Sequence, residues 1–199
     1  LSLKPDYADA YYNMGIALKE NDRLDEAIKA YKKALSLKPD DAEVYYNIGI
    51  TFKEQGRLDE AIKAYKKALS HKPDDAEIYN NIGITLLEQF RLEEAIKAYN
   101  KAISLKPDFA EAWINGAEAL EKWNKLNELK IWLDNAFNSF DTVPADLRFM
   151  KSKFLWRNKK FVETSYLISD IKFENISEIR KKDFLNLKAK CFEKSKNFE

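Results

Sequence analysis

Four of the five prolines, Pro5, Pro39, Pro73 and Pro107, stand 34 residues apart, and this period constrains the fold more than any other feature of the chain. Segments 8–41 and 42–75 are identical at 26 of 34 aligned positions. A fixed period of this length is the signature of one supersecondary unit copied along the chain. The sequence therefore predicts an array of stacked units, each too small to fold around a core of its own.

Each unit contains two stretches of apolar and small residues at helical spacing. In segment 42–75 the first stretch consists of Tyr45, Ile48, Gly49 and Phe52, which share one face of a helix. The second stretch runs over 58–69, and Gly56 between them suits the left-handed conformation just past a helix end. We expect Gly49 to face Ala61 and let the two helices cross closely. The pattern predicts a helix–turn–helix unit and an all-α fold.

Acidic residues mark the expected start of each new helix. Capping-box spacing joins Asp40 with Glu43, Asp74 with Glu77, and Asp108 with Glu111. We therefore interpret the acidic row Asp9, Glu43, Glu77 and Glu111 first as capping residues. The alternative interpretation is that this row recognises basic ligands.

The conserved spacing of eight positions within each unit resembles the tetratricopeptide repeat (TPR) signature. These positions are Tyr11, Met14, Gly15, Leu18, Ala27, Tyr31, Ala34 and Pro39 in the first copy, and they recur in the second and third copies. The resemblance implies a right-handed α-solenoid of helix–turn–helix repeats. Within this family, the sequence most resembles prokaryotic TPR arrays and the TPR superhelix of O-linked N-acetylglucosamine transferase.

The repeat pattern sets the expected domain boundaries. Residues 1–7 match the tail of a preceding repeat, and residues 8–143 hold four repeats, at 8–41, 42–75, 76–109 and a divergent 110–143. In the divergent copy Leu129 replaces a small alanine, and we expect Gly116 to compensate for its larger side chain. Residues 144–199 read as a divergent TPR-like repeat followed by a truncated sixth repeat.

A second stripe on the first helix of each repeat remains after the packing positions are removed. In a TPR superhelix the first helices line the concave face, so the resemblance implies that this stripe faces a groove. Asparagines recur along it at 34-residue spacing, and a carboxamide can both donate and accept hydrogen bonds. We expect them either to hold the backbone of an extended polypeptide, as the asparagine ladder of the transferase does, or to play a shared structural role. The candidate peptide-binding residues are Asn13, Asn47, Asn81, Asn115, Tyr12, Tyr46, Asn80, Ile16, Ile50 and Ile84.

The sequence offers little material for catalysis, metal binding or membrane insertion. The only histidine, His71, stands where Leu37 and Leu105 stand in other repeats, and the single Cys191 is expected to be a buried structural thiol. We expect no catalytic residue, no metal site and no cofactor, and a cytoplasmic protein without a membrane span. The cation-rich clamp with which some TPR domains bind chaperone tails is absent, because only Asn47 matches it.

Three functions remain open at this point. The preferred one is a non-enzymatic protein-interaction scaffold that binds an extended polypeptide in the concave groove. The first alternative is self-assembly into homo-oligomers through the repeat ends or the divergent C-terminal repeats. The second is a targeting arm of a larger enzyme whose catalytic domain lies outside this sequence. The aromatic and basic stretch around Trp156 could contact single-stranded nucleic acid, but helical spacing of its aromatics favours a core role.

Overall fold

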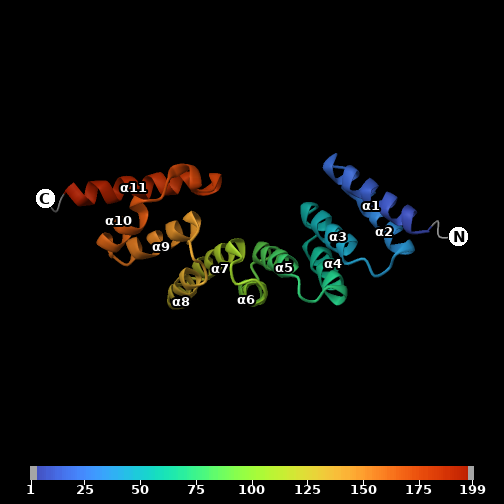
Figure 1. The fold of residues 1–199 in the computed structure, drawn as a ribbon, viewed down its shortest axis with the longest axis horizontal. Helices are drawn as coiled ribbons and strands as arrows, with labels where there is room; N and C mark the ends of the chain where they lie inside the picture. Colours follow the sequence, from blue (N-terminus) through green and yellow to red (C-terminus); the bar gives the residue numbers. More distant parts are fainter. Residues whose placement is uncertain (1–3, 197–199) are drawn as a thin grey trace. The chain divides into compact units, whose positions relative to one another are not determined.

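The computed structural model describes residues 4–196, with side chains described for 7–194, and all regular structure in this part is helical (Figure 1). This confirms the predicted all-α fold of consecutive helix pairs. The chain divides into two units, Leu1–Lys106 and Pro107–Glu199, which we describe separately. The predicted tail of a preceding repeat lies partly outside the described residues, and the first helix already begins at Lys4.

The first unit contains three antiparallel hairpins. Its helices are α1 (Lys4–Glu20), α2 (Leu24–Leu37), α3 (Ala42–Glu54), α4 (Leu58–His71), α5 (Ala76–Glu88) and α6 (Leu92–Leu105). Each hairpin closes on itself, and α2 packs on α3 as α4 packs on α5. Figure 1 shows these helices in chain order from blue to green.

The second unit is less regular. Its helices are α7 (Ala110–Lys122), α8 (Leu126–Asn138), α9 (Ala145–Arg157), α10 (Phe161–Ser169), the short 3-10 helices η1 (Phe173–Asn175) and η2 (Glu178–Arg180), and α11 (Lys181–Lys196). A buried cluster joins α9, α10 and α11, in which the rings of Phe149 and Phe184 meet edge to face at 5.7 Å. Cys191 belongs to this cluster, which confirms the expected buried thiol.

The turn of each of the five hairpins in the described part of the chain contains one residue in the left-handed conformation, at the same place between the two helices. Gly56 has φ of +71°, as its position predicts, and the equivalent residues Asp22, Phe90, Asn124 and Lys159 have φ between 57° and 59°. A left-handed residue at this point ends the first helix and lets the second helix run back against it. The turn therefore tolerates several residue types and does not depend on glycine.

Glycine is required on the first helix, for a reason that differs from the prediction. A Cβ added at Gly49 would lie 2.5 Å from Cδ1 of Tyr65, whose side chain is fully buried. Gly15 meets Tyr31 in the same way, and Gly83 meets Tyr99. The atoms nearest to this Cβ belong to the ring of Tyr65 and not to the expected Ala61, so the missing side chain of the glycine makes room for the aromatic ring of the second helix.

The divergent fourth repeat keeps this pairing with a shift of one residue. Gly116 lies against the indole of Trp132, so it compensates for Trp132 and not for Leu129 as expected. The glycine comes one residue earlier on its helix than Gly49 does, and the aromatic residue also comes one residue earlier. Trp132 gains a hydrogen bond, because its Nε1 donates to the carbonyl oxygen of Trp113 at 2.8 Å.

The helix caps differ by one residue from the predicted ones. Asp41 caps α3, accepting hydrogen bonds from the backbone N–H of Glu43 at 3.1 Å and of Val44 at 3.3 Å. Asp75 caps α5 in the same way, and α7 has Phe109 at this position with no side-chain cap. The predicted caps Asp40, Asp74 and Asp108 are therefore wrong, and no capping box forms at α3 or α5.

Candidate functional site

The first helices of neighbouring repeats in the first unit are joined by a repeated pair of polar side chains. Asn47 on α3 donates from Nδ2 to the hydroxyl of Tyr12 on α1, at 3.1 Å. Asn81 on α5 donates in the same way to the hydroxyl of Tyr46 on α3, at 3.0 Å. The 34-residue period therefore produces a tyrosine–asparagine ladder, defined by these four residues, that runs across α1, α3 and α5.

The orientation of each ladder amide is fixed by its own helix. Nδ2 of Asn47 also donates to the carbonyl oxygen of Glu43 at 3.0 Å, and Nδ2 of Asn81 donates to that of Glu77 at 3.1 Å. A carbonyl oxygen only accepts, so the NH2 side of the amide must face it. Both amide hydrogens are then used, and within the described residues Oδ1 of Asn47 and of Asn81 receives no protein donor.

This geometry corrects part of the sequence-based hypothesis. The amides of Asn47 and Asn81 cannot both donate to and accept from a peptide bond while the ladder is formed. They can only accept a hydrogen bond from a peptide N–H. The structural role that the sequence left open is present, and a ligand could use the remaining oxygen.

A hollow with a volume of about 420 Å³ lies beside the ladder. Residues of α1, α3 and α5 and of the loop before α5 form its wall. They are Tyr12, Ala42, Glu43, Tyr46, Asn47, Lys72, Asp75, Glu77 and Ile78. Three of the ten predicted binding residues, Tyr12, Tyr46 and Asn47, thus come together in one concave site.

Hydrogen bonding and burial hold the tyrosine hydroxyls of the hollow in their protonated form. The hydroxyl of Tyr12 donates to Oε1 of Glu43 at 2.6 Å. Burial, together with this carboxylate, raises the pKa of Tyr12 far above its ordinary value. Burial also raises the pKa of Tyr46, which lies near the carboxylate of Glu77. The two phenols are therefore neutral hydrogen-bonding groups at physiological pH.

The other predicted site residues lie in different surroundings. Asn13 is exposed on α1, and the predicted isoleucines Ile16, Ile50 and Ile84 are half-buried on α1, α3 and α5. Asn80 retains only 7% exposure, so its side chain offers little surface to a ligand, unlike Tyr12 and Tyr46 at the same repeat position. Asn115 is half-buried on α7 of the second unit.

The sequence indicated Glu43 and Glu77 first as capping residues, with recognition of a basic ligand as the alternative, and it gave no role in a site to Lys72 or Asp75. The signal was the double aspartate before each helix, Asp40–Asp41 and Asp74–Asp75. Because the second aspartate supplies the cap, the glutamate two residues later is not needed for it. Its carboxylate is then free to face the hollow.

Ion pairs occupy the corresponding region of the second unit. Glu121 on α7 lies 2.5 Å from Nη1 of Arg157 and 3.7 Å from Nζ of Lys153, both on α9. Glu118 pairs with Arg180. These residues line a further hollow of about 420 Å³, in which acidic and basic groups neutralise each other.

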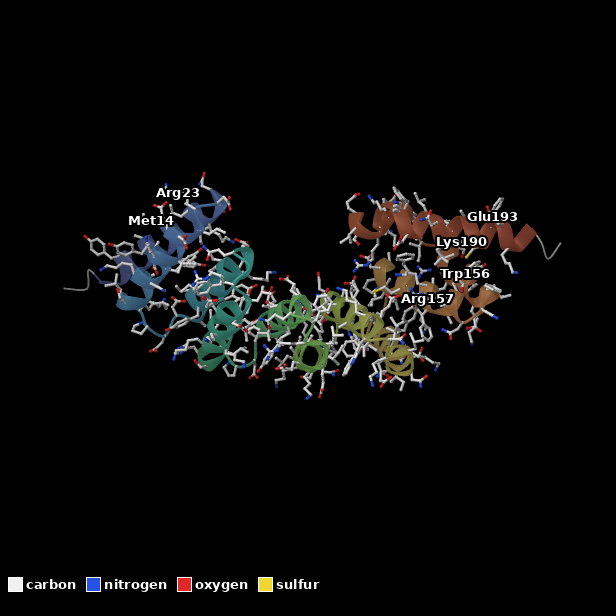
Figure 2. All side chains as sticks on the ribbon, turned by 180° about the vertical axis from the view of Figure 1, so that it is seen from behind. Met14, Arg23, Trp156, Arg157, Lys190 and Glu193 are labelled. Atoms are coloured by element: carbon white, nitrogen blue, oxygen red, sulfur yellow. The ribbon has the colours of Figure 1, made fainter. Side chains whose placement is uncertain are left out.

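The aromatic and basic stretch that could bind nucleic acid is largely engaged within the second unit. Phe149 is buried, and the ring of Trp156 packs against Phe161 at 4.8 Å. Lys151 lies 3.0 Å from Asp134. Figure 2 shows Trp156 and Arg157 at the end of α9 next to Lys190 of α11, and the three residues line a common small hollow. Base stacking would have to displace these contacts.

His71 and Cys191, the two residues considered for chemistry, each have one polar neighbour: Nδ1 of His71 lies 3.8 Å from Oδ1 of Asp40, and the thiol of Cys191 lies near the hydroxyl of Ser165. His71 stacks on Tyr45 with ring centroids 5.7 Å apart, and burial raises the pKa of the Cys191 thiol. Among the described side chains, histidine, cysteine and carboxylate residues nowhere gather in a group that could hold a metal ion. In the same part of the chain, no helix is both long enough and apolar enough to cross a bilayer.

Comparison with known proteins agrees with the repeat architecture. Family models described as "TPR repeat" match residues 17–56 and 49–89, and models described as "Tetratricopeptide repeat" match residues 76–109 and 1–29. The matches together extend from the start of the chain to the end of the third repeat. A search of curated proteins finds no match.

Solved structures with this fold share little sequence with the chain. PilF of Pseudomonas aeruginosa is 19% identical, with 98% of this chain and 93% of PilF covered and a TM-score of 0.71. YrrB, described as a TPR protein with an unusual peptide-binding site, is 20% identical, with 80% and 81% covered and a TM-score of 0.61. The first TPR of Spaghetti (RPAP3), solved with an HSP90 peptide, is 20% identical, with 60% and 94% covered and a TM-score of 0.57. With its matched 34-residue repeats and paired helices, this chain belongs to the tetratricopeptide repeat family.

Proposed function

We propose that this chain is a protein-interaction scaffold that binds an extended polypeptide along the face of α1, α3 and α5. The observation that carries the proposal is the hollow of about 420 Å³ beside the tyrosine–asparagine ladder. Polar acceptors and half-buried aromatic rings line it together. That mixture suits a peptide, which brings backbone N–H groups and apolar side chains to the same surface.

The spacing of the ladder is compatible with an extended chain. Neighbouring packed helices lie about 8–10 Å apart, and an extended polypeptide advances about 3.3 Å per residue. An amide oxygen from each first helix would therefore meet roughly every third peptide N–H. Ile50, half-buried on α3 one turn from Asn47, would add apolar contact.

Two structural neighbours support a peptide ligand in general terms. The structure of Spaghetti (RPAP3) contains an HSP90 peptide, and YrrB is described as having a peptide-binding site. At 20% identity these proteins share the fold with this chain, so the choice of ligand must rest on the residues of this chain. The absence of a predicted cationic clamp argues for a ligand other than a carboxylate-terminated tail.

Selection from a random-peptide phage library tests the proposal. The full chain is the bait, enriched peptides are synthesised with a fluorescent label, and their Kd values are measured by anisotropy. We expect the Ile50→Gln variant to weaken binding several-fold while its thermal unfolding midpoint stays close to that of the parent protein.

The matched control is Ile131→Gln, because Ile131 is an exposed isoleucine on the second helix α8. This variant should bind the selected peptides as the parent does. Failure to enrich any peptide above the bare matrix would refute the proposal. So would peptides whose Kd is the same for the parent and for Ile50→Gln.

A second candidate function, self-assembly, is favoured by exposed apolar residues in the second unit. Val162 on α10 and Ile179 in η2 are 84% and 85% exposed, and Tyr166 and Leu185 are also exposed. Such residues in one unit can form an interface between copies. Light scattering over a wide concentration series tests this: assembly predicts a mass that grows with concentration and falls in the Val162→Lys variant, whereas a constant monomer mass would refute it.

A further inference from the structure

The hollow beside the tyrosine–asparagine ladder carries few free hydrogen-bond donors. Nδ2 of Asn47 uses both hydrogens, and the Tyr12 hydroxyl gives its hydrogen to Glu43. Nζ of Lys72 lies 2.6 Å from the carboxylate of Asp75, so the free donors are its other N–H groups and the hydroxyl of Tyr46. Acceptors remain in excess: the Asn47 oxygen and the carboxylates of Glu43 and Glu77 line the same space.

Charge in the hollow is unbalanced in the same direction. Its ionisable wall residues, apart from the neutral tyrosines, are three acids and one lysine. The lysine, Lys72, is paired with Asp75, which also caps α5. Glu43 and Glu77 are exposed, and within the described residues neither carboxylate has a basic side chain within ion-pair distance. Lys72 also lies near Glu43 and Glu77, but one lysine against three carboxylates leaves the wall with a net negative charge.

Capping does not account for either carboxylate, although both lie in the first turn of their helix, where the helix dipole favours an acidic side chain. The caps of α3 and α5 are Asp41 and Asp75, so Glu43 and Glu77 do not form the capping boxes that their spacing suggests. A metal ion does not explain them either, because no suitable group of ligands exists among the described residues. A second cation that donates several hydrogen bonds, besides Lys72, would balance the wall.

The tyrosine rings add a second feature that suits an organic cation. Tyr12 and Tyr46 are half-buried in the wall, and each is backed by a buried tyrosine at a centroid distance of 6.0 Å, Tyr31 and Tyr65 respectively. Aromatic faces attract ammonium and guanidinium groups and pack against their methylene stems. A small inorganic cation lacks the methylene stem that packs against such a wall.

We propose that this hollow binds a lysine or arginine side chain of the polypeptide ligand. The inference rests on the proposed function and adds a specificity to it: the peptide backbone is read by the ladder amides, and a basic residue is read by Glu43, Glu77 and the two tyrosine rings. Charge complementarity favours this occupant over an acidic side chain, which would meet the net negative charge of the wall.

The test compares peptides selected from the phage library with versions changed at one residue. Each basic residue is replaced in turn by norleucine, which keeps the stem and removes the charge. At low salt we expect one replacement to weaken binding about three- to five-fold, the range of a favourable exposed ion pair, and we expect the difference to shrink at high salt.

The Glu77→Gln variant completes a double-mutant cycle. This variant should weaken binding of the basic peptide by a similar factor and leave the Kd of the norleucine peptide unchanged. Glu77 is preferred to Glu43 because it accepts no side-chain hydrogen bond from Tyr46, whereas Glu43 accepts one from Tyr12. The control is Glu111→Gln, an exposed glutamate at the same repeat position on α7, which should change neither Kd.

The outcomes separate this inference from the proposed function. Peptides that lose affinity for Ile50→Gln but show no basic preference would overturn the basic-residue site and leave the peptide groove standing. Equal weakening of the basic and norleucine peptides by Glu77→Gln would also overturn it. Peptides insensitive to Ile50→Gln would instead refute the groove itself.

Discussion

Replacing Gly49 by alanine tests the contact that sets the spacing between the two helices of a hairpin. The new Cβ would lie 2.5 Å from Cδ1 and 3.0 Å from Cζ of Tyr65, well inside the roughly 3.5–4.0 Å at which carbon atoms attract. Tyr65 is fully buried and cannot turn away into solvent. The helix or the ring must therefore shift.

The magnitude follows from two opposing terms. Overpacking a buried site costs about 1–3 kcal/mol, and the contact with a fixed ring places this site in the upper part of that range. Alanine recovers about 1 kcal/mol through its better helix propensity. We therefore expect the free energy of unfolding to fall by about 1–2 kcal/mol, and the Tm to fall by roughly 2–8 °C.

Urea and thermal unfolding of single and double variants provide the assay. In the Tyr65→Leu background the ring is gone, so Gly49→Ala should cost nothing, which gives a coupling free energy of about 1 kcal/mol or more. Gly56→Asn is the control, because nothing lies within 4 Å of a Cβ at Gly56 and asparagine tolerates its positive φ. A Gly49→Ala protein as stable as the parent, or strict additivity in the double variant, would refute the close approach.

Four further predictions concern the helix caps, two buried tyrosines and the thiol. Asp41→Ala should lower the free energy of unfolding by about 1 kcal/mol in urea titrations, whereas Asp40→Ala should change it by less than about 0.5 kcal/mol; the reverse order would contradict the observed cap. Burial raises the pKa of Tyr31 to about 12, above its unfolded value near 10, so its contribution to stability is complete below pH 10 and is lost as the pH rises toward 12. Tyrosinate absorbance follows the ionisation, and circular dichroism follows the unfolding that should accompany it. Titration of all tyrosines near pH 10 without unfolding would disprove this prediction. The Tyr65 hydroxyl is buried without a hydrogen-bond partner, so Tyr65→Phe should be neutral or stabilising by about 1 kcal/mol, and a clear loss in the unfolding free energy would count against this. Cys191 should react with a thiol reagent only after unfolding; labelling of the native protein at the rate of a free thiol would show that it is accessible.

The repeat fold could be predicted because each hairpin repeats the same local pattern of apolar stripes and turn residues. Spacing alone placed the apolar stripes of 42–52 and 58–69 on helices, and Gly56 at the turn between them. Met14 is the exception: it occupies a core position in the sequence pattern but is 54% exposed, whereas Ile48 at the same position is buried. Ile48 lies on α3, which packs against α2 of the repeat before it, whereas α1 has no described helix before it.

The candidate site was harder to predict because its chemistry arises between repeats. Asn47 and Tyr12 are 35 residues apart, and only the packing of α1 against α3 shows that the amide hydrogens meet a phenol. The release of Glu43 from the cap depends on which of two adjacent aspartates starts the helix, a difference of one residue that spacing rules do not resolve. The sequence identified the face of the first helices as the candidate site, but only the structure shows which of its hydrogen-bond donors and acceptors remain free.

The polar links between hairpins of the first unit use the same residue types at each junction. Asn81 bonds to Tyr46 as Asn47 bonds to Tyr12, and Gln89 bonds to Asp59 as Gln55 bonds to Asp25, both at 3.0 Å. A hairpin such as 42–75 thus presents matching connectors on its leading and trailing sides. An in-frame duplication of such a hairpin would place the same hydrogen-bonding residues at each new junction. The number of repeats, and with it the length of the proposed binding surface, can therefore change without new contacts between repeats.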